Sequence, residues 1–380
     1  MTEEYQETGI RKRKLAPDLA RGFMLLFISF AHAHVFLYSS DGSYTDLDQF
    51  IVLVRQIVID GRAFPMFFLL FGYGMVQFTR SQEKKGSSWP YIGELFHRRG
   101  WCMLFIGLLH AVILFDDIIG MYGLATLLFF PLLRFTDKNL LWISGLFYLL
   151  IILTGAITAR GFDPFSESTI SSSAVQISVI AASAVRTSEW IVYTPLLVYQ
   201  VVPGMLIGIW AARKQILDFP VNHRPLLVRI SLIGIGAAVI GGIPLAMASS
   251  QYWPDVSAEM LTTSKIIHTA TGYLGGIGWA ALIGLASIPL EKSRSTLIMA
   301  IAAAGQRSMT FYIFQSVIFV AFFSPYAGGF GNKMGQFGSD VTALVTWLAS
   351  ILIADVMRRL HLPGPAEYFL RRVTYNRSTH

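Results

Sequence analysis

Long apolar blocks recur along the whole 380-residue chain, and they constrain its fold more than any other feature. Each block has roughly 18–25 residues, the length that an α-helix needs to cross the hydrocarbon core of a bilayer. Hydrophobic residues make up 54% of the chain and charged residues only 14%, whereas a soluble domain carries about 25% charged residues. The sequence therefore predicts an all-α, polytopic bundle of membrane helices.

The apolar blocks predict about ten transmembrane helices in one integral membrane domain, residues 1–380. The predicted spans are 19–38, 51–78, 99–115, 118–134, 139–158, 190–211, 227–248, 265–288, 297–322 and 340–357. No small-residue cleavage site follows the first block, so we interpret it as a retained helix and not as a signal peptide. The longer segments outside the spans are an N-terminal segment 1–17, a loop 159–189 and a C-terminal tail 358–380.

The basic residues predict which side of the membrane each connector faces. Of the 30 Lys and Arg residues, the outer connectors carry only Arg160, Arg186, Lys265 and Lys333, whereas most others gather in the alternate connectors and at the two termini. Lys and Arg accumulate on the cytoplasmic side of membrane proteins. We therefore expect both termini in the cytoplasm and the loop 159–189 outside it. The net charge of +7 arises from these short clusters, which indicates contact with membrane lipids and no nucleic-acid partner.

Histidines and aspartates lie inside or at the outer ends of several predicted spans. His32 and His34 are in the first span, His110 is in the third, and Asp117 stands at its outer mouth. An ionisable group at membrane depth is costly and is therefore a functional candidate. His110 and Asp117 are two helical turns apart, roughly 10 Å along a continuous helix, so direct contact requires the chain to bend at 115–117. A histidine that only bonds the backbone of a neighbouring helix is the simpler alternative.

We expect no metal site in this chain. His32 and His34 are two residues apart and face different sides of a helix, which makes them a poor chelating pair. Cys102 is the only cysteine and cannot form an intrachain disulfide.

A second polar set lies near the predicted cytoplasmic ends of the spans. Its members are Asp18, Arg21, Arg98, Arg99 and Arg307. Arginine at a helix end often reaches lipid phosphate, which is the simpler interpretation for Arg98 and Arg99. Arg21 and Arg307 lie deeper and are better ligand candidates, although Asp18 and Arg21 are three residues apart and could neutralise each other.

Five blocks of the sequence carry the motifs of one known family. They resemble the YeiB-like family of bacterial multi-pass membrane proteins, with a basic pair followed by Gly-Leu-Leu-His, Asp-Ile and Tyr-x-Leu-Ala in the longest block. The blocks are "PDLARGFMLL" (17–26), "FFLLFGYGM" (67–75), "RRGWCMLFIGLLHAVILFDDIIGMYGLATLLFFPLLR" (98–134), "GQRSMTFYIFQS" (305–316) and "GPAEYFLRRVTY" (364–375). The resemblance implies a multi-pass protein of the bacterial cell (inner or plasma) membrane.

This family is similar to a wider superfamily of transmembrane acyltransferases, which includes heparan-α-glucosaminide N-acetyltransferases and bacterial sugar O-acyltransferases. Those proteins move an acyl group from cytoplasmic acyl-CoA to an extracytoplasmic acceptor. The N-acetyltransferases have a histidine before the second helix motif, and residues 54–72 contain none here. Phe311 also stands where the YeiB-like family usually has asparagine.

The resemblance implies acyl-CoA (acetyl-CoA) as donor and a glycan, lipid or small molecule as acceptor. His110, oriented by Asp117, is the preferred general base, and His34 or His32 is the next candidate. Tyr312 can donate to the oxyanion, as can Tyr122 or Gln315. The expected donor-binding residues are Arg21, Arg98, Arg99, Arg307, Asp18 and Gln315.

Two other function classes stay open from the sequence. Intramembrane His, Asp and Arg also serve proton coupling, which favours a transporter or permease of a small molecule as the alternative. A non-catalytic partner or sensor is the third class. The sequence also leaves a homo-oligomer open.

Overall fold

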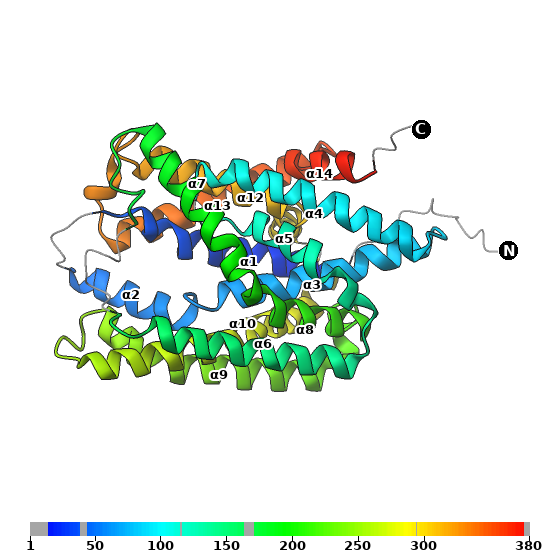
Figure 1. The fold of residues 1–380 in the computed structure, drawn as a ribbon, viewed down its shortest axis with the longest axis horizontal. Coiled ribbons are helices and arrows are strands. Elements are labelled where there is room, and N and C mark those ends of the chain that lie inside the picture. The colour runs from blue at the N-terminus through cyan, green and yellow to red at the C-terminus, as the bar shows by residue number, and fades with distance from the viewer. Residues whose placement is uncertain (1–13, 39–43, 115, 163–170, 294, 376–380) are drawn as a thin grey trace.

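The computed structural model describes residues 14–38, 44–114, 116–162, 171–293 and 295–375, and these residues form helices joined by turns (Figure 1). The α-helices are α1 (Leu15–Ala33), α2 (Asp46–Val58), α3 (Ala63–Glu83), α4 (Trp89–Ala111), α5 (Ile118–Phe129), α6 (Asp137–Thr158), α7 (Val179–Leu197), α8 (Val201–Arg213), α9 (Arg224–Ser249), α10 (Ala258–Ser293), α11 (Thr296–Gln306), α12 (Ser308–Phe323), α13 (Gln336–Arg359) and α14 (Pro365–Tyr375). The predicted all-α polytopic bundle is confirmed.

Among the described residues, six helical segments are long and apolar enough to cross a membrane. They are Leu15–Phe36, Asp137–Thr158, Val179–Arg213, Pro220–Ser249, Ala258–Glu291 and Gln336–Arg359. The pair α11 and α12 adds a seventh if the two helices, which are bent by 88° at Arg307, count as one span. Helices α3 and α4 reach a comparable length but carry more polar residues, so they are not among these segments. The total of about ten crossings therefore stays a prediction.

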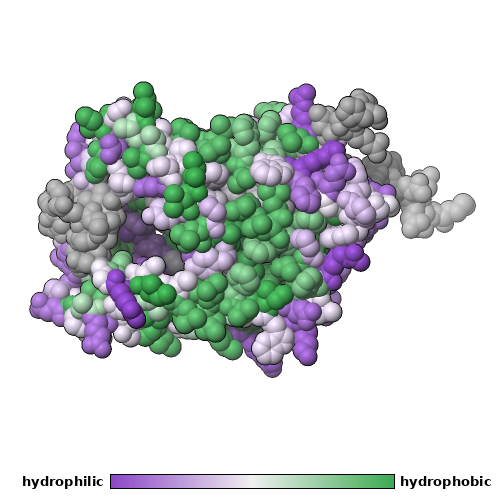
Figure 2. All heavy atoms as spheres, in the orientation of Figure 1, coloured by the Kyte–Doolittle hydropathy of each residue, from purple (hydrophilic) through white to green (hydrophobic). Residues whose placement is uncertain are grey.

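The surface of the bundle is apolar around its middle. Figure 2 shows a hydrophobic band across the molecule, with hydrophilic residues gathered at both ends. Large apolar side chains such as Trp142, Ile240 and Leu352 are mostly exposed. Contiguous apolar surface of this extent is rare on soluble proteins, whereas it matches a hydrocarbon solvent. The chain is a multi-pass membrane protein.

Close packing of α1 against α11 places the predicted basic residues in the bundle. A Cβ atom on Gly305 would lie 1.9 Å from the carbonyl oxygen of Asp18, and one on Gly22 would lie 2.3 Å from that of Ile301. Only glycine permits such a close backbone approach. The crossing therefore fixes the start of α1, which carries Asp18 and Arg21.

Two of the predicted connectors contain helix. The end of the predicted loop 159–189 is already helical, because α7 starts at Val179 and continues through α8 as one 35-residue helical segment. Within the tail 358–380, α14 packs on α4 and α12. The carboxylate of Glu367 accepts hydrogen bonds from the backbone N–H groups of Met309 and Thr310, at 2.8 and 3.2 Å, and so caps the start of α12. The N-terminal segment 1–17 lies mostly outside the described residues.

We predict that both termini face the cytoplasm, since the start of α1 and α14 lie towards the same end of the bundle (Figure 1). Green fluorescent protein fused to either terminus should fluoresce, and alkaline phosphatase fused there should be inactive. Phosphatase inserted in the loop 159–189 should be active as the positive control. An active phosphatase at either terminus would contradict this topology.

Candidate functional site

His110 and Asp117 are in direct contact because the chain turns between α4 and α5. Helix α4 ends at Ala111, and Asp117 is the residue that precedes the first turn of α5. The Nδ1 atom of His110 lies 2.7 Å from Oδ1 of Asp117. The separation of roughly 10 Å expected for one continuous helix does not apply, because the helix ends before Asp117.

The carboxylate of Asp117 accepts hydrogen bonds from several donors at once. The backbone N–H groups of Ile119 and Gly120 donate to it at 3.1 and 2.6 Å, and the indole N–H of Trp190 in α7 donates at 3.3 Å. An aspartate that caps a helix start is stabilised in its ionised form. An ionised carboxylate can only accept, so the proton of His110 is on Nδ1 and its Nε2 is an acceptor.

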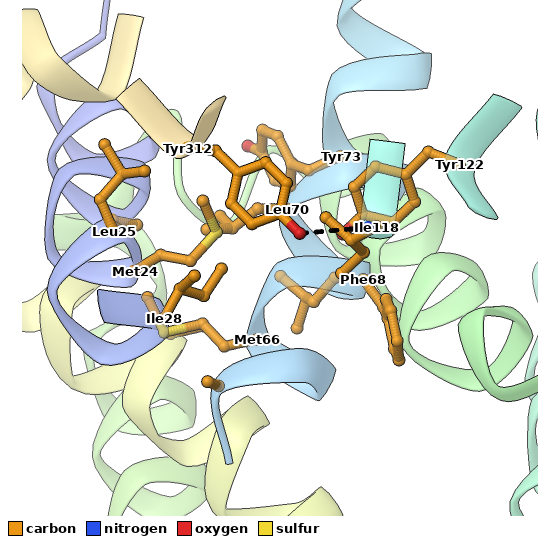
Figure 3. Close-up of a cluster of buried hydrophobic side chains, with 14 of the residues drawn as sticks. Met24, Leu25, Ile28, Met66, Phe68, Leu70, Tyr73, Ile118, Tyr122 and Tyr312 are labelled. Atoms are coloured by element: carbon orange, nitrogen blue, oxygen red, sulfur yellow. Dashed lines mark hydrogen bonds between the residues drawn. The ribbon is translucent and has the colours of Figure 1, made fainter. Parts of the chain in front are cut away.

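Two residues from two further helices, Tyr312 and His32, form a cluster with His110. The ring of Tyr312 in α12 lies 5.0 Å from the ring of His110 and 5.9 Å from the ring of His32 in α1. The hydroxyl of Tyr312 donates to the carbonyl of Asp116 at 3.1 Å and accepts from the backbone N–H of Ile118 at 3.3 Å; Figure 3 shows the second bond. The structure thus brings three predicted catalytic residues together.

Polar atoms without a partner mark the centre of this cluster. Among the described residues, Nε2 of His110, Nε2 of His32 and the hydroxyl of Tyr122 are buried and have no hydrogen-bond partner. Nε2 of His32 is 3.9 Å from the nearer carboxylate oxygen of Asp116. Buried polar groups are nearly always satisfied, so unsatisfied ones are candidate positions for a bound molecule.

A cavity of about 320 Å³ lies towards the predicted cytoplasmic end, and Tyr122 and Tyr312 of this region line it. Arg21 and Arg99 line one part of it, and Tyr122 and Tyr312 line another. We call it the arginine cavity. Since His110 follows Arg99 by eleven residues, the two lie about 16 Å apart along α4. The wall between them is aromatic, and the ring of Tyr122 stacks on Phe71 at 4.0 Å.

The two arginines of this cavity have different partners. Arg21 donates to Asp18 at 3.3 Å, and Asp18 also accepts from Gln306 at 2.9 Å. Asp18 does not line the cavity, and its contact with Arg21 holds that guanidinium group in position. The guanidinium of Arg99 lies over the ring of Phe78, 5.1 Å from its centroid. No ion pair joins Arg99 to a carboxylate within the described part of the chain.

The other predicted donor-binding residues lie outside the lining of the arginine cavity. Arg98 pairs with Glu94 at 2.5 Å, one turn away on α4. The guanidinium of Arg307 donates to the carbonyl of Leu362 at 2.7 Å, which ties the segment before α14 to the bend between α11 and α12. Gln315 donates to the carbonyl of Leu25 at 3.2 Å.

His34 lines a second cavity, of about 380 Å³, at the predicted outer end. His268, Asp60 and Lys265 also line it, and we call it the histidine cavity. Figure 2 shows a hollow with hydrophilic walls towards this end of the molecule. His34 therefore lies apart from the cluster of His32, His110 and Tyr312. Over residues 14–38, 44–114, 116–162, 171–293 and 295–375, no three His, Cys, Asp or Glu side chains come together as a metal site.

We predict that Gly107→Ala destabilises the His110–Asp117 pair. A Cβ atom at Gly107 would lie 2.3 Å from Cα of Gly120 and 2.4 Å from Oδ2 of Asp117. Overpacking of this kind costs about 1–3 kcal/mol, so the melting temperature of the purified protein should fall. The control is Gly145→Ala, because nothing lies near that position on α6. Its melting temperature should stay equal or rise; an equal effect of the two substitutions would contradict the close α4–α5 contact.

Comparisons with known proteins agree with the fold and the motifs. Residues 211–377 match the family described as "Protein of unknown function (DUF418)". The chain is 22% identical over 407 residues to "Uncharacterized protein YxaH" of Bacillus subtilis (strain 168), covering 97% of this chain and 96% of that protein. It is 22% identical over 390 residues to "Uncharacterized protein YeiB" of Escherichia coli (strain K12), covering 96% of each. No solved structure matches the chain significantly. With its motifs in the expected order and both similarities running over nearly its whole length, the chain resembles the YeiB-like family of bacterial multi-pass membrane proteins.

Proposed function

We propose that this protein is an acyltransferase of the bacterial inner membrane, which moves an acyl group from cytoplasmic acyl-CoA to an acceptor at the outer face. One observation carries the proposal: two cationic side chains share the lining of the arginine cavity with Tyr312, whose ring contacts the buried His110. Arg21 and Arg99 lie at one part of the cavity, and Tyr312, in contact with His110, lies at another.

The lining of the arginine cavity suits the parts of an acyl-CoA. Guanidinium groups bind phosphate through paired hydrogen bonds, so Arg21 and Arg99 would hold the phosphates at the cytoplasmic opening. The wall towards Tyr122 is formed by side chains such as Phe67, Phe71 and Met103, which suit the less polar arm of the donor. This arrangement would bring the thioester to the polar atoms beside His110.

His110 has the environment of a general base. Its Nδ1–H is held by the ionised Asp117, and its Nε2 is free to accept a proton from the hydroxyl or amine of the acceptor. The acceptor then attacks the thioester carbon, and the carbonyl oxygen becomes an oxyanion. Collapse of this intermediate forms the ester or amide and breaks the C–S bond, and the His110 imidazolium returns its proton to the CoA thiolate. Asp117 stabilises the imidazolium in between.

Tyr122 is better suited to bind the oxyanion than Tyr312. The hydroxyl of Tyr312 already donates to the carbonyl of Asp116. Tyr122 lines the same cavity, and its buried hydroxyl has no partner among the described residues. A donor held in a site that excludes water stabilises an oxyanion strongly.

We predict that Arg99→Ala weakens acetyl-CoA binding about tenfold or more, because a hydrogen bond to a charged group contributes about 1.5–3 kcal/mol. Isothermal titration of the detergent-purified protein with acetyl-CoA measures the change. The matched control is Arg98→Ala, the adjacent arginine that pairs with Glu94 outside the cavity. Equal affinities of the two variants would contradict the proposed orientation of the donor.

We predict that His110→Ala lowers the release of CoA thiol from acetyl-CoA by about 10²-fold or more, the usual effect of losing a general base. Acetyl-CoA binding should stay within a few-fold of the unaltered protein, because His110 lies beyond the phosphate-binding part of the cavity. The control is His97→Ala, an exposed histidine on the same helix. Unchanged thiol release in inverted vesicles of the His110 variant would refute the assignment.

Transport is a second candidate function, and broken helices favour it. Helix α2 ends at Val58 and α3 begins at Ala63, while α11 and α12 are bent by 88°. Transporters often build their binding sites from such discontinuous helices. Transport predicts pH-dependent uptake of a small solute into proteoliposomes that is lost in Asp117→Asn, without any release of CoA thiol.

A further inference from the structure

The histidine cavity combines fixed hydrogen-bonding groups with an apolar wall. Its polar lining includes His34, Gln56, Asp60, Lys265 and His268, which come from the segments around α1, α2 and α10. Residues 64, 65 and 68 of α3, two phenylalanines and a proline, supply the apolar wall. Its volume of about 380 Å³ falls in the range of small-molecule sites, about 300–1,000 Å³.

Both histidines in this cavity have hydrogen-bonding partners. Nε2 of His268 contacts the guanidinium of the fully buried Arg62, which can only donate. The same Nε2 also lies 3.2 Å from the carbonyl oxygen of Gln56, which can only accept, so these contacts do not fix the tautomer of His268. In His34, Nδ1 lies 3.1 Å from the carbonyl oxygen of Phe30 and donates to it. Its Nε2 is therefore an acceptor.

The lining of the histidine cavity carries one acidic side chain, Asp60, and one basic side chain, Lys265. The carboxylate of Asp60 lies 3.4 Å from Nε of Arg55, which compensates part of its charge. The ammonium of Lys265 lies over the ring of Phe162, 4.4 Å from its centroid. An ion of either sign would meet one of these groups as a repelling charge. A neutral molecule with several hydroxyl groups uses all of them, since a hydroxyl both donates and accepts.

We propose that the histidine cavity binds a small neutral polyhydroxylated molecule of monosaccharide size. Its hydroxyl groups would bond Asp60, Lys265 and the two histidines, and its C–H face would pack on the phenylalanine and proline wall. On the proposed function, this molecule is the acceptor of the acyl group, so that role rests on the acyltransferase proposal. The binding itself does not depend on it.

Contacts between the two cavities support the role as acceptor site. The ring of Phe64, which lines the histidine cavity, lies 6.1 Å from the ring of His32. The ring of His32 lies 5.9 Å from that of Tyr312, which lines the arginine cavity. His32 thus lies between Phe64 of the histidine cavity and Tyr312, whose ring also contacts His110.

Protection of an introduced cysteine from labelling tests this inference. Cys102, the only cysteine and a buried one, is replaced in Cys102→Ser, and Thr269→Cys then places a thiol in the cavity lining. A membrane-impermeant thiosulfonate added to intact cells should label this thiol. D-Glucose or N-acetyl-D-glucosamine at ten times its dissociation constant should slow the labelling roughly tenfold, as simple competition requires.

Matched variants sharpen the outcome. Asp60→Asn should remove most of the protection, and Asp46→Asn, an exposed aspartate on α2, should leave it intact. Gln56→Cys provides a second labelling position in the same cavity. The inference is overturned if neither sugar protects either thiol in the folded protein, if the zwitterion glycine betaine protects in their place, or if the reagent reaches neither thiol from outside.

The assay contains no acyl donor, so it separates the two proposals. Sugar protection together with unchanged acetyl-CoA affinity in Arg99→Ala would keep the histidine cavity as a sugar site and remove the acyltransferase. Loss of acetyl-CoA affinity in Arg99→Ala without sugar protection would keep the acyltransferase proposal. It would overturn the proposal that the acceptor is a sugar-like molecule.

Discussion

The carboxylate of Asp117 joins three helices at the centre of this protein. It caps the first turn of α5, receives the Nδ1–H of His110 at the end of α4, and accepts the indole N–H of Trp190 from α7. An ionised carboxylate inside a membrane bundle is tolerated only when its charge is compensated and its lone pairs are satisfied. The hydrogen bond from His110 is one of those that stabilise Asp117 there, and it also fixes the tautomer of His110. The contact that joins α4 to α5 therefore also sets which nitrogen of His110 carries the proton.

Helix α3 separates the two cavities and gives the protein two distinct ends. Phe67 and Phe71 face the arginine cavity, whereas Phe64 and Phe68 line the histidine cavity. One end thus offers guanidinium groups for an anionic ligand, and the other offers neutral polar groups with one acidic and one basic side chain. A transfer reaction across a membrane needs this asymmetry, because its two substrates approach from opposite sides and must meet at one base.

The sequence predicts the helices better than it predicts the partners of each residue. Apolar length alone identifies the bundle, and the cost of burying a histidine singles out His110. The end of α4 at Ala111 could not be placed from the sequence, because residues 112–115 continue the apolar run of this helix. The choice between Arg98 and Arg99 also needs the structure, since two neighbours on a helix point about 100° apart and α4 has no clear apolar face. Trp190 was missed because its contact with Asp117 joins residues 73 positions apart.

A cryo-electron microscopy structure of the protein with acetyl-CoA tests the central claim most directly. The account predicts density for the donor in the arginine cavity, with its phosphates at Arg21 and Arg99 and its thioester within hydrogen-bond reach of Tyr122. The Nδ1 contact between His110 and Asp117 should persist in that structure. Donor density elsewhere on the protein, or an arginine cavity that stays closed at saturating acetyl-CoA, would contradict the account.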